Sequence, residues 1–131
     1  MSIHHFALWT EQPERLRDFY CRYFGGTAGP LYENPKKGFR SYFVRFAHGP
    51  AIEIMSRADV KSRAENEVLG YCHLAFACAS EQEVRECTDR FRKDGFAILG
   101  EPRTTGDGYF ESVIADPDGN PVELAYDPLG R

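Results

Sequence analysis

The chain of 131 residues is long enough for one domain with a buried core, and its 42% hydrophobic and 14% aromatic content is typical of a globular protein. A formal net charge of −4 argues against general affinity for nucleic acid, which needs a basic surface. No stretch approaches the roughly 20 apolar residues of a membrane span, and the N-terminus lacks the features of a signal peptide. We therefore expect a cytoplasmic protein with neither nucleic-acid nor membrane partners.

The first half of the chain begins with a short apolar segment, His-Phe-Ala-Leu-Trp at 5–9, that predicts a strand. Thr10 is a candidate helix cap, and Pro13 suits a first helical turn. Apolar residues then recur at helical spacing until Gly25 and Gly26, which are expected to end the helix. Three further strands are predicted at 31–32, 41–46 and 51–55, with a hairpin turn at 47–50.

The second half repeats this order of elements. A strand is predicted at 72–77, and Ser80 with Glu83 forms the capping-box pattern of a helix start. The inward face of that helix is expected to carry Val84, Cys87, Thr88 and Phe91, and Gly95 is expected to end it. The remaining strands are predicted at 97–99, 109–115 and 122–126, with a turn at 116–120.

The four cysteines, Cys21, Cys72, Cys78 and Cys87, show no C-x-x-C spacing. The absence of this spacing argues against a zinc knuckle. In a reducing compartment we expect buried thiols.

An internal duplication organises the chain. Residues 38–55 align with residues 108–125 without a gap, at a constant offset of 70, and Glu53 matches Glu123. His5 matches His73 at an offset of 68. We infer an α+β fold of two tandem βαβββ modules within a single domain, 1–131. Module one covers 1–56, a polar and charged linker 57–69, and module two 70–131.

The duplicated histidines and glutamates form a candidate metal site. A carboxylate among the apolar residues of a strand needs a partner, and imidazole and carboxylate together suit a divalent ion. The candidate ligands are His5, Glu53, His73 and Glu123. His4 is the rival of His5 and is expected to face the other side of the strand, while the parallel with Cys72-His73 selects His5. His48 falls in a turn and is interpreted as a surface residue.

Several of these features resemble the vicinal oxygen chelate superfamily, which includes glyoxalase I, bleomycin resistance proteins and dioxygenases. The resemblance is carried by His5, the pair Phe19-Tyr20 and the segment Asp-Pro-Asp-Gly-Asn-Pro-Val-Glu-Leu at 116–124. The chain is most similar to small bacterial glyoxalase-I-like (lactoylglutathione lyase-like) proteins. The resemblance implies a curved, partly closed mixed sheet with helices outside. It also implies a homodimer in which the ligands of one ion come from one chain or from two.

The same resemblance implies a metalloenzyme that moves a proton on a metal-chelated hemithioacetal or related α-hydroxycarbonyl compound. Glu123 is the expected base and Glu53 its counterpart. One divalent ion is expected at each site, nickel or cobalt by preference, with zinc or manganese as alternatives.

Three positions bear on the small-molecule substrate. Trp9 stands where typical bacterial glyoxalases carry an arginine for a glutathione carboxylate, and Arg57 stands where they carry an asparagine. Arg103 offers a further positive charge near the pocket mouth, or is an ordinary loop arginine. These differences leave the physiological substrate and thiol open.

Two other classes of function remain as alternatives. A dioxygenase or an antibiotic-modifying transferase of the superfamily uses two histidines and one glutamate, so that Glu53 would not be a ligand. A metal-free protein that binds an antibiotic or another small molecule would lack the histidines.

Overall fold

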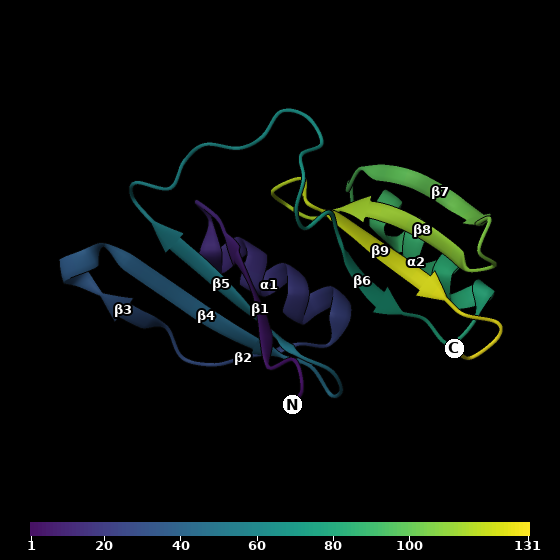
Figure 1. Ribbon diagram of the computed structural model, residues 1–131, viewed down its shortest axis with the longest axis horizontal. Helices are drawn as coiled ribbons and strands as arrows, with labels where there is room; N and C mark the ends of the chain where they lie inside the picture. Colours follow the sequence, from purple (N-terminus) through teal and green to yellow (C-terminus); the bar gives the residue numbers. More distant parts are fainter. The chain divides into compact units, whose positions relative to one another are not determined.

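The computed structural model describes all 131 residues as two compact units, Met1–Glu65 and Asn66–Arg131. The first unit contains β1 (His5–Trp9), α1 (Pro13–Phe24), β2 (Thr27–Ala28), β3 (Tyr32–Asn34), a short 3-10 helix (Pro35–Lys37), β4 (Phe39–Arg45) and β5 (Ala51–Arg57). The second contains β6 (Leu74–Ala77), α2 (Glu81–Lys93), β7 (Ile98–Thr104), β8 (Phe110–Ala115) and β9 (Pro121–Tyr126) (Figure 1).

Each unit is built on its own mixed sheet. The strand order is β1-β5-β4-β2 in the first unit, where β3 also pairs with β4, and β6-β9-β8-β7 in the second. The first strand of each unit runs parallel to the last, and all other pairs are antiparallel. The predicted α+β fold of two tandem modules is therefore confirmed, with each of the two sheets open rather than closed.

The third element of the repeat differs between the modules. Module two has one continuous strand, β7, whose register against β8 shifts on both sides of Gly100. Module one has two short strands, β2 and β3, that pair with separate parts of β4. At the offset of 70, Pro30 stands in the place of Gly100. Proline has no backbone N–H to donate to a neighbouring strand, so the strand is interrupted there.

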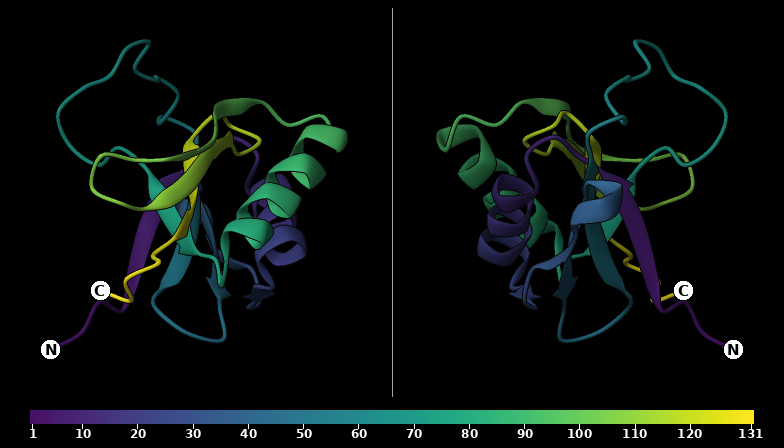
Figure 2. Two further views of the ribbon diagram at one scale, coloured as in Figure 1. Left: turned by 90° about the vertical axis from the view of Figure 1, so that its right-hand side faces the viewer. Right: turned by 90° about the vertical axis from the view of Figure 1, so that its left-hand side faces the viewer.

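Helix α1 covers one face of the first sheet and buries Leu16, Phe19 and Tyr20 against β4 and β5 (Figure 2). It begins at Pro13 and ends at Gly25, which has the left-handed conformation. The expectation that Thr10 caps this helix is wrong. The N-cap is Gln12, without a side-chain cap, and the Thr10 hydroxyl instead accepts a hydrogen bond from the Gln12 N–H at 3.0 Å.

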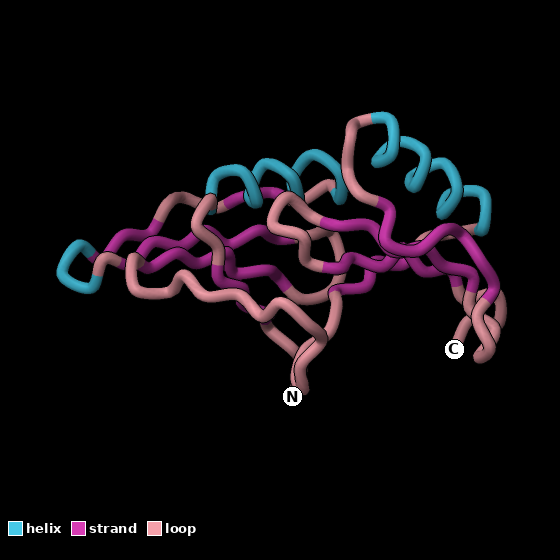
Figure 3. Tube along the Cα trace, turned by 90° about the horizontal axis from the view of Figure 1, so that it is seen from above, coloured by secondary structure: helices cyan, strands magenta, loops and turns pink.

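Helix α2 covers one face of the second sheet and packs on β7, β8 and β9 (Figure 3). Ser80 caps it as predicted, because its hydroxyl accepts from the Glu83 N–H at 3.1 Å. Val84, Thr88 and Phe91 are buried, while Cys87 is only partly buried. The Thr88 hydroxyl lies 2.7 Å from that of Ser112 on β8, so this buried polar pair links the helix to the sheet.

The last hairpin of each module places its glutamate strand. Gly49 and Gly119, at the offset of 70, both have positive φ, 81° and 82°, which the turn requires. In module two, Asp116 adds a brace, because its carboxylate accepts from the backbone of Asp118 and from the backbone and side chain of Asn120. The turn thereby fixes the start of β9 and, with it, the position of Glu123 on that strand.

Two further expectations can be compared with the structure. The four cysteines are free. The expectation of a buried thiol is wrong for Cys72, which is exposed, and Cys21, Cys78 and Cys87 are only partly buried. No helix has the length and apolar character needed to span a membrane.

Candidate metal centre

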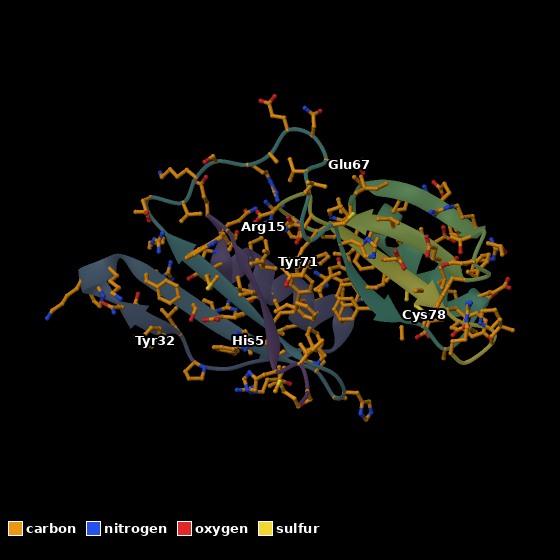
Figure 4. The ribbon with its side chains drawn as sticks, in the orientation of Figure 1. His5, Arg15, Tyr32, Glu67, Tyr71 and Cys78 are labelled. Atoms are coloured by element: carbon orange, nitrogen blue, oxygen red, sulfur yellow. The ribbon has the colours of Figure 1, made fainter.

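In module one, His5 and Glu53 meet on the face of the sheet opposite α1. Ala7 on β1 pairs in parallel with Glu53 on β5, and His5 lies two residues before Ala7, so both side chains emerge on one face. The distance from His5 Nε2 to Glu53 Oε2 is 3.5 Å, and the Glu53 side chain is 17% exposed. Phe43, the β4 partner of Glu53, packs edge-on against the His5 ring. Figure 4 labels His5 at the start of β1.

His4 lies beside His5 rather than facing away from it, which corrects the expectation for that residue. The two Nδ1 atoms are 2.8 Å apart and the rings meet edge to face. This contact occupies the Nδ1 side of His5 and leaves Nε2 directed at Glu53. A hydrogen bond at the other ring nitrogen is the usual means by which proteins orient a metal-binding histidine.

Module two repeats the pair. The distance from His73 Nε2 to Glu123 Oε2 is 3.2 Å, and the Glu123 side chain is 15% exposed. His73 lies just before β6, which begins at Leu74 and not at Cys72 as predicted. The parallel register of Ala75 with Glu123 matches that of Ala7 with Glu53, so the duplication seen in the sequence is reproduced in three dimensions.

The donors of each pair fit a divalent ion. Two ligands held by one ion at right angles, with bonds of about 2.1 Å, lie about 3.0 Å apart. The observed separations of 3.5 Å and 3.2 Å are close to this value. Imidazole nitrogen and carboxylate oxygen are also the donors that zinc, nickel and cobalt accept. Each module thus offers two ligands, and within neither module do three or more His, Cys, Asp or Glu side chains form a metal-binding group.

A second carboxylate, Glu111, lies beside Glu123 and was not predicted. Val113 is the β8 partner of Glu123, and Glu111 lies two residues away on the same face. The Glu111 side chain is 13% exposed, and its carboxylate accepts from Arg103 Nη2 at 3.0 Å. Burial raises the pKa of Glu111, and the charge of Glu123 and a hydrogen bond to it raise it further, against the opposing effect of Arg103.

The signal for Glu111 was present in the sequence. It is the single charged residue of the predicted strand 109–115, and a charge within an apolar strand needs a partner. The duplication does not indicate Glu111, because its counterpart in module one is Ser41. Arg103, a predicted substrate residue, lies on β7 and is the partner of this carboxylate.

The other two predicted substrate residues lie together in module one. The Arg57 guanidinium stacks over the Trp9 ring, 5.1 Å from its centre. It also donates to both carboxylate oxygens of Asp59, at 2.5 Å and 3.2 Å. Arg57 is the last residue of β5 rather than the start of the linker.

Solved structures share this fold. Glyoxalase I of Leishmania major, described as trypanothione-dependent, matches with a TM-score of 0.77 and 22% identity over 96% of this chain and 86% of that one. Lactoylglutathione lyase of Agrobacterium tumefaciens matches at 0.70 and 21%, over 98% and 96%. A glyoxalase family protein of Enterococcus faecalis matches at 0.74 and 25%, over 94% and 95%.

The sequence itself identifies the family. No functionally curated protein matches the chain. The pattern of the Glyoxalase/Bleomycin resistance protein/Dioxygenase superfamily matches residues 2–124, which is nearly the whole chain and includes both His–Glu pairs. The resemblance inferred from the sequence is confirmed. The chain belongs to the Glyoxalase/Bleomycin resistance protein/Dioxygenase superfamily.

Proposed function

We propose that this protein is a divalent-metal-dependent, glyoxalase-I-like lyase or isomerase. Its substrate is a hemithioacetal or a related α-hydroxycarbonyl compound. The observation that carries the proposal is the repeated pair, His5 with Glu53 and His73 with Glu123, each with its two donors at the spacing of two ligands of one ion. The four side chains bind one ion, nickel or cobalt by preference, and the two modules that supply them come from one chain or from two.

A bound divalent ion would polarise the substrate oxygens and make the neighbouring C–H bond more acidic. The residues of the chain then have distinct tasks. His5 and His73 bind and orient, while a glutamate carboxylate carries the proton between adjacent carbons. Glu123 is the proposed carrier, because Glu111 beside it gives module two a second carboxylate, whereas Ser41 stands at that place in module one.

The position of Glu53 favours this function over the other classes in the superfamily. A dioxygenase or transferase site with two histidines and one glutamate would leave Glu53 without a role. Here its carboxylate is mostly buried and directed at His5. A carboxylate in such surroundings needs a cation or a donor.

The test uses protein purified without a histidine tag. The metal content is measured as isolated, and apo-protein is then loaded with nickel, cobalt, zinc or manganese. Each form is assayed with methylglyoxal and a panel of thiols that includes glutathione and bacillithiol. We expect turnover with nickel or cobalt. Inactive nickel- and cobalt-loaded protein with every thiol would contradict the lyase assignment.

Three variants test the ligands separately from turnover. Glu53→Gln and His73→Ala should lower both the metal content and the melting temperature in the presence of metal, since a bound ion stabilises only the folded state. His48→Ala is the matched control, because this exposed histidine lies in the turn after β4. Equal metal content in all three variants would exclude Glu53 and His73 as ligands.

A further inference from the structure

Three aromatic rings and one guanidinium gather on the sheet of module one. We call Trp9, Tyr32, Phe39 and Arg57 the aromatic platform. The Trp9 and Phe39 ring centres are 6.2 Å apart and those of Tyr32 and Phe39 are 6.0 Å apart, both edge to face. Trp9 is 40% exposed and Tyr32 56% exposed, so the rings present apolar area to the solvent. Figure 4 labels Tyr32 on β3.

The platform lies on the same face of the sheet as His5 and Glu53. Along β1, side chains alternate, so His5, Ala7 and Trp9 share one face. Trp9 pairs with Met55, two residues beyond Glu53, and Phe39 pairs with Arg57. A step of two residues along a strand covers about 6.6 Å.

The space between Glu53 and the platform carries no bulky side chain of β1. The residue opposite Glu53 is Ala7, which is exposed and ends at its Cβ atom. A ring attached to a group held at Glu53 therefore reaches Trp9 without displacing a β1 side chain. On β5, the half-buried Met55 lies between Glu53 and Arg57 on this face, so the ring would pack over its flexible side chain.

The charge on the platform is already neutralised. Arg57 is its single cation, and both Arg57 contacts with Asp59 are hydrogen bonds to a carboxylate. The guanidinium plane covers Trp9, and its N–H donors are directed at Asp59. A carboxylate-bearing thiol such as glutathione thus finds no unpaired cation here, whereas a neutral ring finds aromatic edges and faces of matching polarity.

We propose that the aromatic platform binds an aryl group of the substrate, so that this protein acts on hemithioacetals of aryl-substituted α-oxoaldehydes. The inference rests on the proposed function. In the reaction, the C–H bond of the thiohemiacetal carbon breaks, and a C–H bond forms on the adjacent carbon that bears the ring. The product is a thioester of an aryl α-hydroxy acid, and no oxidant or reductant is consumed.

The kinetic test compares phenylglyoxal with methylglyoxal in nickel-loaded protein, with 2-mercaptoethanol as an uncharged thiol for both. We expect kcat/KM for phenylglyoxal to be at least about tenfold higher than that for methylglyoxal, which is the gain in binding expected from one well-packed aromatic ring. Tyr32→Ala, on an exposed edge strand, should reduce this preference several-fold, because kcat/KM for phenylglyoxal falls more than kcat/KM for methylglyoxal. Tyr23→Ala is the control, because Tyr23 lies on α1 and packs on Phe19.

A binding test needs no turnover. Trp9 is the one tryptophan of the chain, so tryptophan fluorescence reports on the platform alone. In nickel-loaded protein, mandelate should change this fluorescence with a Kd at least about tenfold lower than that of lactate, which has a methyl group in place of the ring. The Tyr32→Ala variant retains Trp9 and should lose most of the difference.

The two tests separate the inference from the proposed function. Turnover of both aldehydes with equal kcat/KM, or a preference that survives Tyr32→Ala, overturns the inference and leaves the function standing. Selective binding of mandelate without turnover of either aldehyde overturns the function and leaves the aryl subsite standing. Equal Kd values for mandelate and lactate, or no binding of either, overturn the subsite.

Discussion

At the scale of single residues, the carboxylates of Glu53 and Glu123 each lie in surroundings that favour the metal we propose. Each is mostly withdrawn from water and has one imidazole as its near neighbour. A neutral imidazole gives only one hydrogen bond, which is weak compensation for a desolvated carboxylate. A divalent cation would satisfy the imidazole and the carboxylate of each pair at once, and this is the physical reason for the metal we propose.

Replacing Glu123 with glutamine should separate proton transfer from binding. The change keeps the shape of the side chain but removes the group that carries the proton, so we expect kcat to fall by about 10²- to 10⁴-fold while KM changes little. The comparison is made at saturating metal, with Glu11→Gln, a change on an exposed residue, as control. A kcat within a few-fold of the wild type would assign the proton carrier elsewhere.

The thiols should differ sharply in reactivity. Burial raises the pKa of Cys78 to about 12, with Cys87 and Glu83 contributing by their charge. Because the thiolate is the reactive form, Cys78 should resist iodoacetamide at pH 8 and begin to react only as the pH approaches its pKa. Exposed Cys72 should be alkylated first.

Peptide mass spectrometry across a pH series measures both thiols in one sample, and unfolded protein shows the rate without burial. Similar alkylation rates for Cys72 and Cys78 in folded protein at pH 8 would show that burial does not protect the Cys78 thiol.

The duplication in the sequence accounts for what could be predicted at this scale. Two histidines and two glutamates in matched positions indicated the pairs that the structure brings together. Contacts that break the repeat could not be read in the same way. The His4–His5 contact depends on how the chain enters β1, and the contact of Glu111 with Glu123 depends on a diagonal between strands. Neither follows from spacing along one strand.

At the scale of elements, strand and helix positions were predicted well where hydrophobic period and turn residues agree. The strand at 5–9 and the helix ending at Gly25 are examples. The short pairings of β2 and β3 were harder to predict, because two or three residues carry no clear period. β2 and β3 form strands only because they pair with β4. The length of β7 likewise depends on register shifts around Gly100, which the sequence pattern does not indicate.

The buried pair of Thr88 and Ser112 should be coupled in stability. Thr88 donates its one hydroxyl hydrogen to the Val84 carbonyl at 2.6 Å, so in the contact between α2 and β8 the Ser112 hydroxyl donates to Thr88. Thr88→Val preserves shape but leaves the Ser112 hydroxyl buried without its partner, which should lower the free energy of unfolding by about 1–3 kcal/mol.

Adding Ser112→Ala removes the unpaired group, so the double variant should lose less than the sum of the two single variants. Urea unfolding of the four proteins gives the coupling energy. Strict additivity would mean that the two hydroxyls do not depend on each other.

At the scale of the whole molecule, the two modules keep the same His–Glu pair and differ in what surrounds it. Beside His5 and Glu53, module one has the aromatic platform. Beside His73 and Glu123, module two has Glu111 with Arg103. At the matching offset, Ala77 replaces Trp9, so the platform exists once. The duplicated fold thus surrounds the repeated His–Glu pair with aromatic side chains in one module and with charged side chains in the other.

If one ion takes ligands from both modules, as we propose, it should stabilise both modules. Nickel at about 100 times its Kd should raise the free energy of unfolding by about 2.7 kcal/mol. Hydrogen exchange should slow in β5 and in β9 together, because each strand carries one of the proposed glutamate ligands. His5→Ala removes a ligand of module one, yet it should abolish the metal-induced protection of β9 as well. Protection of β9 that survives in this variant would show that the modules bind metal independently.

Sedimentation of the same samples shows whether the two modules that bind one ion belong to one chain or to two. We expect a homodimer at micromolar concentration with nickel bound, in keeping with a site that takes one module from each of two chains. If the ion joins two chains, His5→Ala should weaken the dimer, because each lost ligand removes a link between subunits and association then rests on protein contacts alone. If the ion joins two modules of one chain, the variant should lose protection in β9 without any change in mass. A nickel-loaded protein that sediments as a monomer at every concentration excludes a site shared between subunits and leaves the four ligands to a single chain.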